Sequence, residues 1–185
     1  MPIVPDTKDW TWVLQRRCPD CGYDAAATRF EDLPVRMREI AASWQQVLGA
    51  GEAARGRPVE DRWSDLEYAC HVRDVFRLFD VRLHLMLDED DPTFANWDQD
   101  ETAITDRYGE QDPATVAAEL SSAAGRLADS FAAVPAEEHR RTGTRSDGAR
   151  FTVDSLGRYL LHDPVHHLHD VGAGQHGAGL EGAGA

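Results

Sequence analysis

Apolar residues recur at the 3.6-residue period of an α-helix in four separate stretches, and no stretch shows the alternation of a half-buried strand. The predicted helices cover about residues 33–48, 65–87 and 113–134, and a fourth begins near residue 152 and continues towards His162. The clearest start is Ser64-Asp65-Leu66-Glu67, in which Ser64 and Glu67 form a capping box. This pattern predicts an all-α fold, a four-helix bundle whose long connections do not require simple up-and-down topology.

The helices divide the chain into three predicted parts. Residues 1–27 form an irregular N-terminal extension, residues 28–171 form the bundle, and residues 172–185 form a Gly/Ala-rich tail expected to be disordered. A chain of 185 residues is long enough for one domain with a sizeable core and too short for two ordinary ones. We therefore expect a single folded domain.

The charge is strongly acidic and unevenly distributed. Lys and Arg number 19 against 33 Asp and Glu, which gives −14, and residues 88–112 alone hold ten acidic residues against one arginine, a net of −9. An acidic chain repels phosphate backbones, so nucleic acid is not an expected partner. Residues 88–112 are expected to form a solvated loop, with a lid over a site as the alternative.

Sequence features also favour a cytoplasmic protein without a membrane partner. No apolar run approaches the roughly 20 residues needed to cross a bilayer. The first residues lack the basic and apolar regions of a secretory signal. The three cysteines are odd in number and have no disulfide-framework spacing.

Histidine is concentrated near the end of the chain, where five of the eight histidines fall within the last 24 residues. His162 and His166 are four residues apart, so on a helix both imidazoles share one face and can bind one metal ion. Imidazole suits zinc, nickel or iron better than magnesium or calcium. His71, on the apolar side of the second helix, is the best third ligand, and three ligands with an open position are typical of a catalytic site.

Each of these signals has a simpler interpretation. A histidine on an apolar face, such as His71, can be a hydrogen-bonded core residue. Pro164 removes a helical hydrogen bond between the two other ligands and can kink the helix there.

The sequence Cys18-Pro19-Asp20-Cys21-Gly22 is typical of half a zinc knuckle. A closed zinc site needs four ligands, and Cys70 with one histidine could complete it, in competition with the site that uses His71. A redox-active dithiol and a simple turn with two reduced cysteines are the alternatives.

Two segments resemble motifs of the DinB/YfiT-like superfamily. Trp63-Ser64-Asp65-Leu66-Glu67-Tyr68-Ala69-Cys70-His71-Val72-Arg73-Asp74 is similar to its second-helix motif, and Tyr159-Leu160-Leu161-His162-Asp163-Pro164-Val165-His166-His167-Leu168 to its last-helix H-x-x-x-H motif. The resemblance covers about residues 28–171. It implies a four-helix bundle with a metal bound by His71, His162 and His166, with His167 as the alternative to His166.

The resemblance also implies a reaction. Members of the superfamily include S-transferases that use low-molecular-weight thiols such as mycothiol or bacillithiol, and the segment Asn96-Trp97-Asp98-Gln99-Asp100 is similar to the mycothiol-linked branch. We therefore expect a metal-dependent thiol S-transferase acting on a small electrophile, with zinc as the first choice of metal. The alternatives are a non-catalytic metal-binding or ligand-binding bundle and a metal-dependent hydrolase.

Further residues are candidates for supporting roles at this site. Arginine side chains could meet carboxylates of the thiol co-substrate, and the candidates are Arg73, Arg145, Arg150 and Arg158. Asp163 or Asp74 could orient a ligand imidazole. The expected partner is a small-molecule substrate, and a homodimer is a further expectation.

Overall fold

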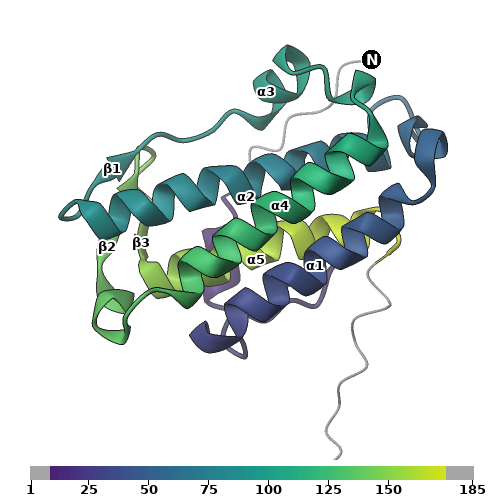
Figure 1. Ribbon diagram of the computed structural model, residues 1–185. Coiled ribbons are helices and arrows are strands. Elements are labelled where there is room, and N and C mark those ends of the chain that lie inside the picture. The colour runs from purple at the N-terminus through teal and green to yellow at the C-terminus, as the bar shows by residue number, and fades with distance from the viewer. Residues whose placement is uncertain (1–8, 174–185) are drawn as a thin grey trace, which may run out of the picture.

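The computed structural model describes residues 9–173, and these form a helical bundle with a small sheet at one end (Figure 1). The helices are α1 (Leu33–Leu48), α2 (Asp65–Asp88), α3 (Gln99–Thr105), α4 (Pro113–Ala132) and α5 (Val153–Asp170). Short 3₁₀ helices precede or connect them: η1 (Thr11–Leu14), η2 (Phe30–Asp32), η3 (Gly51–Arg55), η4 (Tyr108–Glu110) and η5 (Ala136–Arg140). Four of the five α-helices are the predicted ones, so the predicted fold class is confirmed.

The ends of the helices follow from local hydrogen bonding. At the start of α2 the Ser64 hydroxyl accepts from the Glu67 backbone N–H, and the Glu67 carboxylate accepts from the Ser64 N–H at 2.8 Å. This is the predicted capping box, and it satisfies two donors that a helix start leaves unpaired. A second capping box, made by Thr152 and Ser155, begins α5. The predicted cap Asp32 precedes α1 but makes no capping hydrogen bond.

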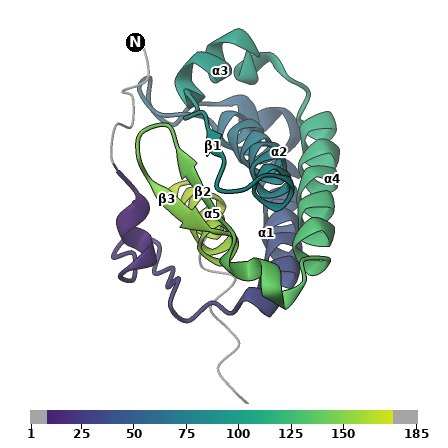
Figure 2. The same cartoon turned by 90° about the vertical axis from the view of Figure 1, so that its left-hand side faces the viewer.

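The four long helices do not follow each other around the bundle. Helix α4 packs along both α1 and α2, and α5 contacts the same two helices. In Figure 2, which looks obliquely along the helices, α4 and α5 lie on opposite sides of the α1 and α2 pair. The topology is therefore not a simple sequence of adjacent antiparallel helices.

Large apolar side chains from all four long helices fill the centre. Trp44, Phe76, Leu120, Phe131 and Leu156 are each at most 1 % exposed. Close packing requires a glycine in α5, because a Cβ on Gly157 would lie 2.5 Å from Leu33 Cδ1. This contact fixes how α5 is rotated against α1, and hence which α5 side chains face each neighbour.

A three-stranded sheet, which the sequence did not predict, closes one end of the bundle. Its strands are β1 (Thr93–Phe94), β2 (Thr142–Arg145) and β3 (Arg150–Thr152), with β1 parallel and β3 antiparallel to β2. Strands of two to four residues are too short to show an alternating pattern. The usable signal was Asp147-Gly148, a hairpin dipeptide whose glycine adopts φ +92°.

The acidic segment 88–112 is more ordered than the expected solvated loop. It contains β1, α3 and η4, and Tyr108 in η4 is 1 % exposed. The Tyr108 hydroxyl donates to Asp74 in α2 at 2.7 Å, and the Trp97 indole donates to Thr102. The first of these hydrogen bonds fastens the segment to α2 and the second lies within the segment, so the segment is ordered and is not the freely solvated loop that we expected.

The N-terminal segment crosses α5 instead of extending away from the bundle. Val13, Cys18 and Tyr23 are buried, and the Tyr23 hydroxyl donates to the Arg158 carbonyl of α5 at 2.8 Å. Of the predicted tail, residues 174–185 lie outside the described residues. Within residues 9–173, no helix combines the length and hydrophobicity that a membrane span requires.

Candidate metal centres

Helix α5 carries two interleaved pairs of possible ligands. His162 and His166 form one i, i+4 pair, and Asp163 and His167 form another, displaced by one residue. One residue corresponds to a rotation of about 100°, so the two pairs lie on neighbouring faces of the helix. One face meets the N-terminal segment and the other meets α2.

The second pair meets His71 from α2, and we name these three residues the histidine–aspartate cluster. Asp163 Oδ1 and Oδ2 both lie 3.2 Å from His71 Nε2, and Asp163 Oδ2 lies 3.9 Å from His167 Nε2. One possible ligand atom from each residue lies within 4.8 Å of the others. Two imidazoles and one carboxylate thus converge on one point between α2 and α5.

His71 is held rigidly in this cluster. Its side chain is fully buried, two turns after the capping box of α2, and its ring stacks on Trp97 with centroids 5.2 Å apart and planes 7° apart. Trp63 lies against the same ring at 5.4 Å. His71 Nδ1 is buried and has no hydrogen-bond partner among the described residues.

A fourth residue orients His167. Asp170 Oδ2 lies 2.9 Å from His167 Nδ1, and a carboxylate can only accept, so Nδ1 carries the proton and Nε2 is left as the ligand atom. Burial opposes ionisation of Asp170, but its hydrogen bond with His167 together with the charges of His167, His166 and Arg62 outweighs burial and lowers the pKa of the carboxyl. Asp170 is therefore an anion at neutral pH and fixes the tautomer of His167.

The donor set of this cluster fits a divalent transition metal. Burial would raise the pKa of Asp163, but the imidazoles of His71 and His167 outweigh burial and hold it below its usual range. An ionised carboxylate with two imidazoles is a ligand set of catalytic zinc sites and of non-haem iron sites. Three protein ligands leave coordination positions for other molecules.

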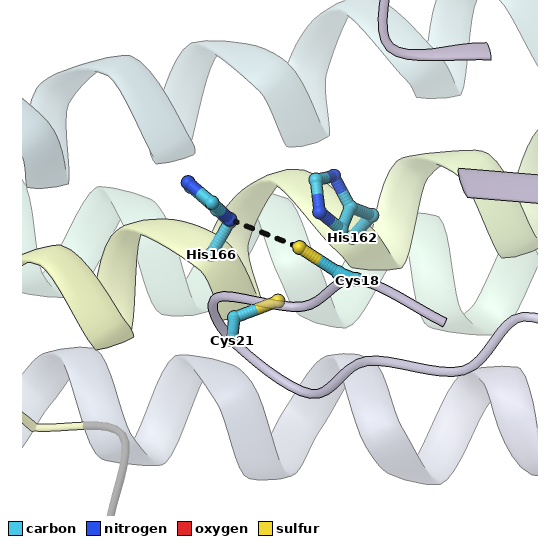
Figure 3. A group of neighbouring side chains, drawn as sticks. All are labelled: Cys18, Cys21, His162 and His166. Atoms are coloured by element: carbon cyan, nitrogen blue, oxygen red, sulfur yellow. Dashed lines mark hydrogen bonds between the residues drawn. The ribbon is translucent and has the colours of Figure 1, made fainter. Parts of the chain in front are cut away.

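The first pair meets two cysteines, and we name Cys18, Cys21, His162 and His166 the cysteine–histidine cluster. Figure 3 shows their two sulfurs and two imidazoles pointing towards one another from the N-terminal segment and α5. Cys18 Sγ lies 3.7 Å from His166 Nδ1, and one possible ligand atom from each residue lies within 4.8 Å of the others. Burial, followed by the charge of His166, lowers the pKa of His162 to about 4, which keeps this imidazole neutral.

A cleft of about 860 Å³ opens beside both clusters. Apolar and aromatic side chains form much of its wall, including Leu78, Phe79, Trp63, Trp97 and Tyr159. All five residues of the segment 96–100 also line it. The cleft can hold a small molecule next to the histidine–aspartate cluster.

Three arginines line this cleft among several aspartates, and two of them, Arg82 and Arg145, place their guanidinium groups near each other. Arg145 pairs with Asp147 at 2.8 Å and donates to the Tyr159 hydroxyl. Arg82 is 5 % exposed, donates to the Ala95 carbonyl and makes no ion pair with a described residue. Its Nε is buried and has no hydrogen-bond partner within residues 9–173, and burial lowers the pKa of this guanidinium to about 10.

The structure divides the predicted ligand set. His71 lies in the histidine–aspartate cluster with His167, the predicted alternative, whereas His162 and His166 lie in the cysteine–histidine cluster. Pro164 stays inside α5, where its carbonyl accepts from the Trp44 indole at 3.3 Å. The assignment of ligands stays a prediction, and the geometry groups its members differently.

The other predicted candidates are also dispersed. Cys70 Sγ faces the Tyr108 carbonyl at 3.8 Å and belongs to neither cluster. Of the four candidate arginines only Arg145 lines the cleft. The remaining three pair with carboxylates elsewhere: Arg73 with Asp74 and Glu119, Arg150 with Asp91, and Arg158 with Asp154.

Comparison with known proteins agrees with this architecture. The sequence model of the DinB superfamily matches residues 29–171, most of the chain. The chain belongs to the DinB superfamily. Among solved structures it is similar to YfiT from Bacillus subtilis, a probable metal-dependent hydrolase with an unusual four-helix bundle topology. The TM-score is 0.69 at 18 % identity, over 78 % of this chain and 85 % of that chain.

A search among curated proteins gives no match. At 18 % identity the likeness to YfiT shows a shared fold and does not transfer residues or reactions. The roles of individual side chains therefore depend on the geometry described above.

Sequence reasoning missed two residues for which a signal existed. Asp163 was considered only as a partner of a ligand, although Asp163 and His167 have the same spacing as His162 and His166. Arg82 follows His71 by eleven residues, close to three helical turns, which places both side chains on one face of α2.

Proposed function

We propose that this DinB-superfamily protein is a metal-dependent enzyme that joins a low-molecular-weight thiol, such as mycothiol, to a small electrophile. The observation that carries the proposal is the histidine–aspartate cluster beside a cleft large enough for a small molecule. His71, Asp163 and His167 would hold a divalent ion, with zinc the first choice and nickel or iron also suited to the donors. A bound ion would supply Lewis acidity and lower the pKa of a thiol or water.

The residues around the cluster support this reaction by positioning and by excluding water. Asp170 fixes His167, and Trp63 and Trp97 enclose His71, so the ligand atoms are preorganised. Trp97 belongs to the segment that resembles the mycothiol-linked branch, and that whole segment lines the cleft. The contact between Trp97 and His71 thus connects the expected thiol site with the expected metal site.

The part of the cleft wall around Arg82 suits a small electrophile with an anionic group. Phe79, Leu78 and Tyr159 offer an apolar surface, and Arg82 and Arg145 offer guanidinium groups at the same wall. Arg82 lacks an ion pair with any described residue, so a carboxylate of a ligand would supply the partner that the protein does not. Arg145 replaces the three other arginines considered from sequence.

Hydrolysis is the second candidate reaction. It is favoured by the structural likeness to YfiT, a probable metal-dependent hydrolase. The same cluster and cleft would serve either reaction, because thiol and water are alternative nucleophiles at one site. The two functions differ in whether product formation needs an added thiol.

The test is an assay of the zinc-loaded full-length protein with mycothiol or bacillithiol and a bimane electrophile. The wild type is expected to form the thiol adduct faster than the uncatalysed reaction does. In His71→Ala the rate of adduct formation is expected to fall by about 100-fold or more, because the variant loses metal affinity. His84→Ala is the matched control, since His84 lies on the exposed side of the same helix. Metal content is measured for all three proteins.

The outcomes separate the candidate functions. Cleavage of an ester or amide panel without thiol, lost in His71→Ala, would replace the transferase with a hydrolase. A metal-loaded protein that shows neither reaction would indicate a non-catalytic binding bundle and overturn the proposal. The homodimer expected from sequence stays a prediction.

A further inference from the structure

We infer that Cys18, Cys21, His162 and His166 form a second, structural metal site that takes zinc and fastens the N-terminal segment to α5. This inference is independent of the proposed reaction. It concerns the face of α5 that the histidine–aspartate cluster does not use. The four side chains converge there, the buried imidazole of His162 has a ring nitrogen without a hydrogen-bond partner among the described residues, and the two cysteines lie in one tight turn.

The first observation is the convergence of four soft or borderline donors. In a tetrahedral zinc site with bonds of about 2.0–2.3 Å, neighbouring ligand atoms lie roughly 3.3–3.8 Å apart. Cys18 Sγ and His166 Nδ1 are already 3.7 Å apart, and one ligand atom from each of the four residues lies within 4.8 Å of the others (Figure 3). Small side-chain movements would complete the tetrahedron.

The second observation is the buried imidazole of His162. This residue is 4 % exposed, and its Nε2 has no hydrogen-bond partner among the described residues. A buried polar atom without a partner is costly, so such atoms in native proteins usually have an unseen one. In this location a metal ion between the two sulfurs is the partner that the donor set favours.

The third observation is the shape of the turn that carries the sulfurs. The Gly22 N–H donates to the Cys18 carbonyl at 3.0 Å, and the Cys18 N–H donates to the Tyr23 carbonyl at 2.8 Å. Gly22 has φ +75°, which glycine adopts without strain. Arg17 closes the turn by donating to the Gly22 carbonyl at 2.8 Å. The turn is therefore shaped by its own backbone and brings Cys21 back beside Cys18.

The ligand count assigns this site a structural role. Two thiolates and two imidazoles from the protein fill a tetrahedral zinc ion and leave no position for a substrate. The site would connect residues 148 positions apart in sequence, Cys18 and His166. It would also hold the turn of α5 from which Asp163 and His167 point towards α2.

The test is cobalt substitution of the reduced full-length protein, because only sulfur ligands give an intense thiolate-to-cobalt charge-transfer band. The wild type is expected to show this band and to bind zinc at this site with a stoichiometry of about one. Cys18→Ser and Cys21→Ser, which each keep one thiolate, are expected to reduce the band by about half, and the double variant is expected to lose it. Cys70→Ser, which changes the cysteine outside the cluster, and His71→Ala are expected to keep it.

Two results would overturn the site. One is a reduced, cobalt-loaded wild type without the band, for example because Cys18 and Cys21 work as a redox dithiol. The other is a band of full intensity in both Cys18→Ser and Cys21→Ser, or any such band in the double variant. If those variants do not fold, protection of Cys18 and Cys21 from alkylation by zinc in the wild type, read by mass spectrometry, decides the question, and unprotected thiols contradict the site. Failure of the thiol-transfer assay leaves each of these readouts unchanged.

Discussion

The two neighbouring faces of α5 carry the same spacing of ligands but meet different partners. On one face His162 and His166 meet two cysteines from the N-terminal segment, which brings the number of protein donors to four. On the other face Asp163 and His167 meet a single histidine from α2, which leaves the number at three. Four donors close a tetrahedral ion, whereas three leave room for a substrate.

This difference shows that an i, i+4 pair of ligands on one helix does not by itself determine whether a metal site is structural or catalytic. A rotation of about 100° around α5 separates a proposed structural centre from a proposed catalytic one. The role depends on what the neighbouring segment supplies: two sulfurs in a tight turn, or one buried imidazole at the edge of a cleft.

The largest expected effect is on stability when metal is removed from the cysteine–histidine cluster. At free zinc about 1,000-fold above the dissociation constant, binding to the folded state alone adds roughly 4 kcal/mol to the free energy of unfolding. We expect a chelator to lower the urea midpoint of the wild type and to expose Arg16 and Arg17 to trypsin. Cys18→Ser should already be sensitive and respond much less. An equal chelator effect in both proteins would remove the distinction between the two faces.

A smaller effect is expected when the orientation of His167 in the histidine–aspartate cluster is disturbed. Asp170→Asn leaves all three ligands of the histidine–aspartate cluster in place but weakens the acceptor for His167 Nδ1. Loss of such a partner typically costs about 10–100-fold in metal affinity. We expect that loss in a competitive zinc titration, with the cobalt–thiolate band unchanged. Asp154→Asn, a carboxylate of the same helix that pairs with Arg158, is the control.

The bundle could be predicted because its signals are local. The capping box of Ser64 and Glu67 and the turn at Asp112-Pro113 define helix starts from adjacent residues, and the structure has both. The sheet could not be predicted in the same way, since β1 pairs with β2 through Thr93 and Thr144, far apart in sequence. Two or three residues of strand carry too little pattern to indicate such a pairing.

The site was partly predictable for the same physical reason. The i, i+4 spacing showed that α5 can bind metal, and the apolar arc of α2 placed His71 inside. Which pair on α5 faces His71 depends on the rotation of α5, and this is set by packing such as the approach of Gly157 to Leu33. The approach of Cys18 to His166 depends on the path of the N-terminal segment, which has no periodic pattern.

A substitution of Arg82 would test whether the cleft beside the histidine–aspartate cluster binds an anion. A buried guanidinium without a carboxylate partner costs stability, so Arg82→Met is expected to keep or raise the urea midpoint. It should weaken binding of a haloacetate by about 10-fold or more and leave the matching haloacetamide unaffected. KM values for the two electrophiles measure this. Equal effects on both would show that Arg82 does not bind the carboxylate, and Arg150→Gln, at the surface, is the control.

The smallest expected effect is on the free energy of unfolding when Glu67 is changed. Glu67 supports only the histidine–aspartate cluster, because it caps the start of α2, the helix that carries His71. Its carboxylate accepts from the Ser64 N–H and from Arg57 Nε, each at 2.8 Å. Burial alone would raise its pKa, but the hydrogen bonds from Arg57 and Ser64 outweigh burial and lower the pKa from the model-peptide value of 4.5. The ionised group therefore stabilises the folded state above pH 4.5, and this contribution is lost as the pH falls through the folded pKa.

Glu67→Gln is accordingly expected to lower the free energy of unfolding by about 1 kcal/mol at pH 7, and this difference is expected to shrink as the pH falls through the folded pKa and the wild type loses the same charge. Urea unfolding of the metal-stripped proteins at pH 7 and over a series of lower pH values measures this, with the exposed Glu110→Gln as the control. A pH-independent difference would assign the effect to packing and not to charge. Because Glu67 touches neither Cys18 nor α5, the cobalt–thiolate band should stay unchanged, and its loss would mean that the two faces of α5 are coupled through α2.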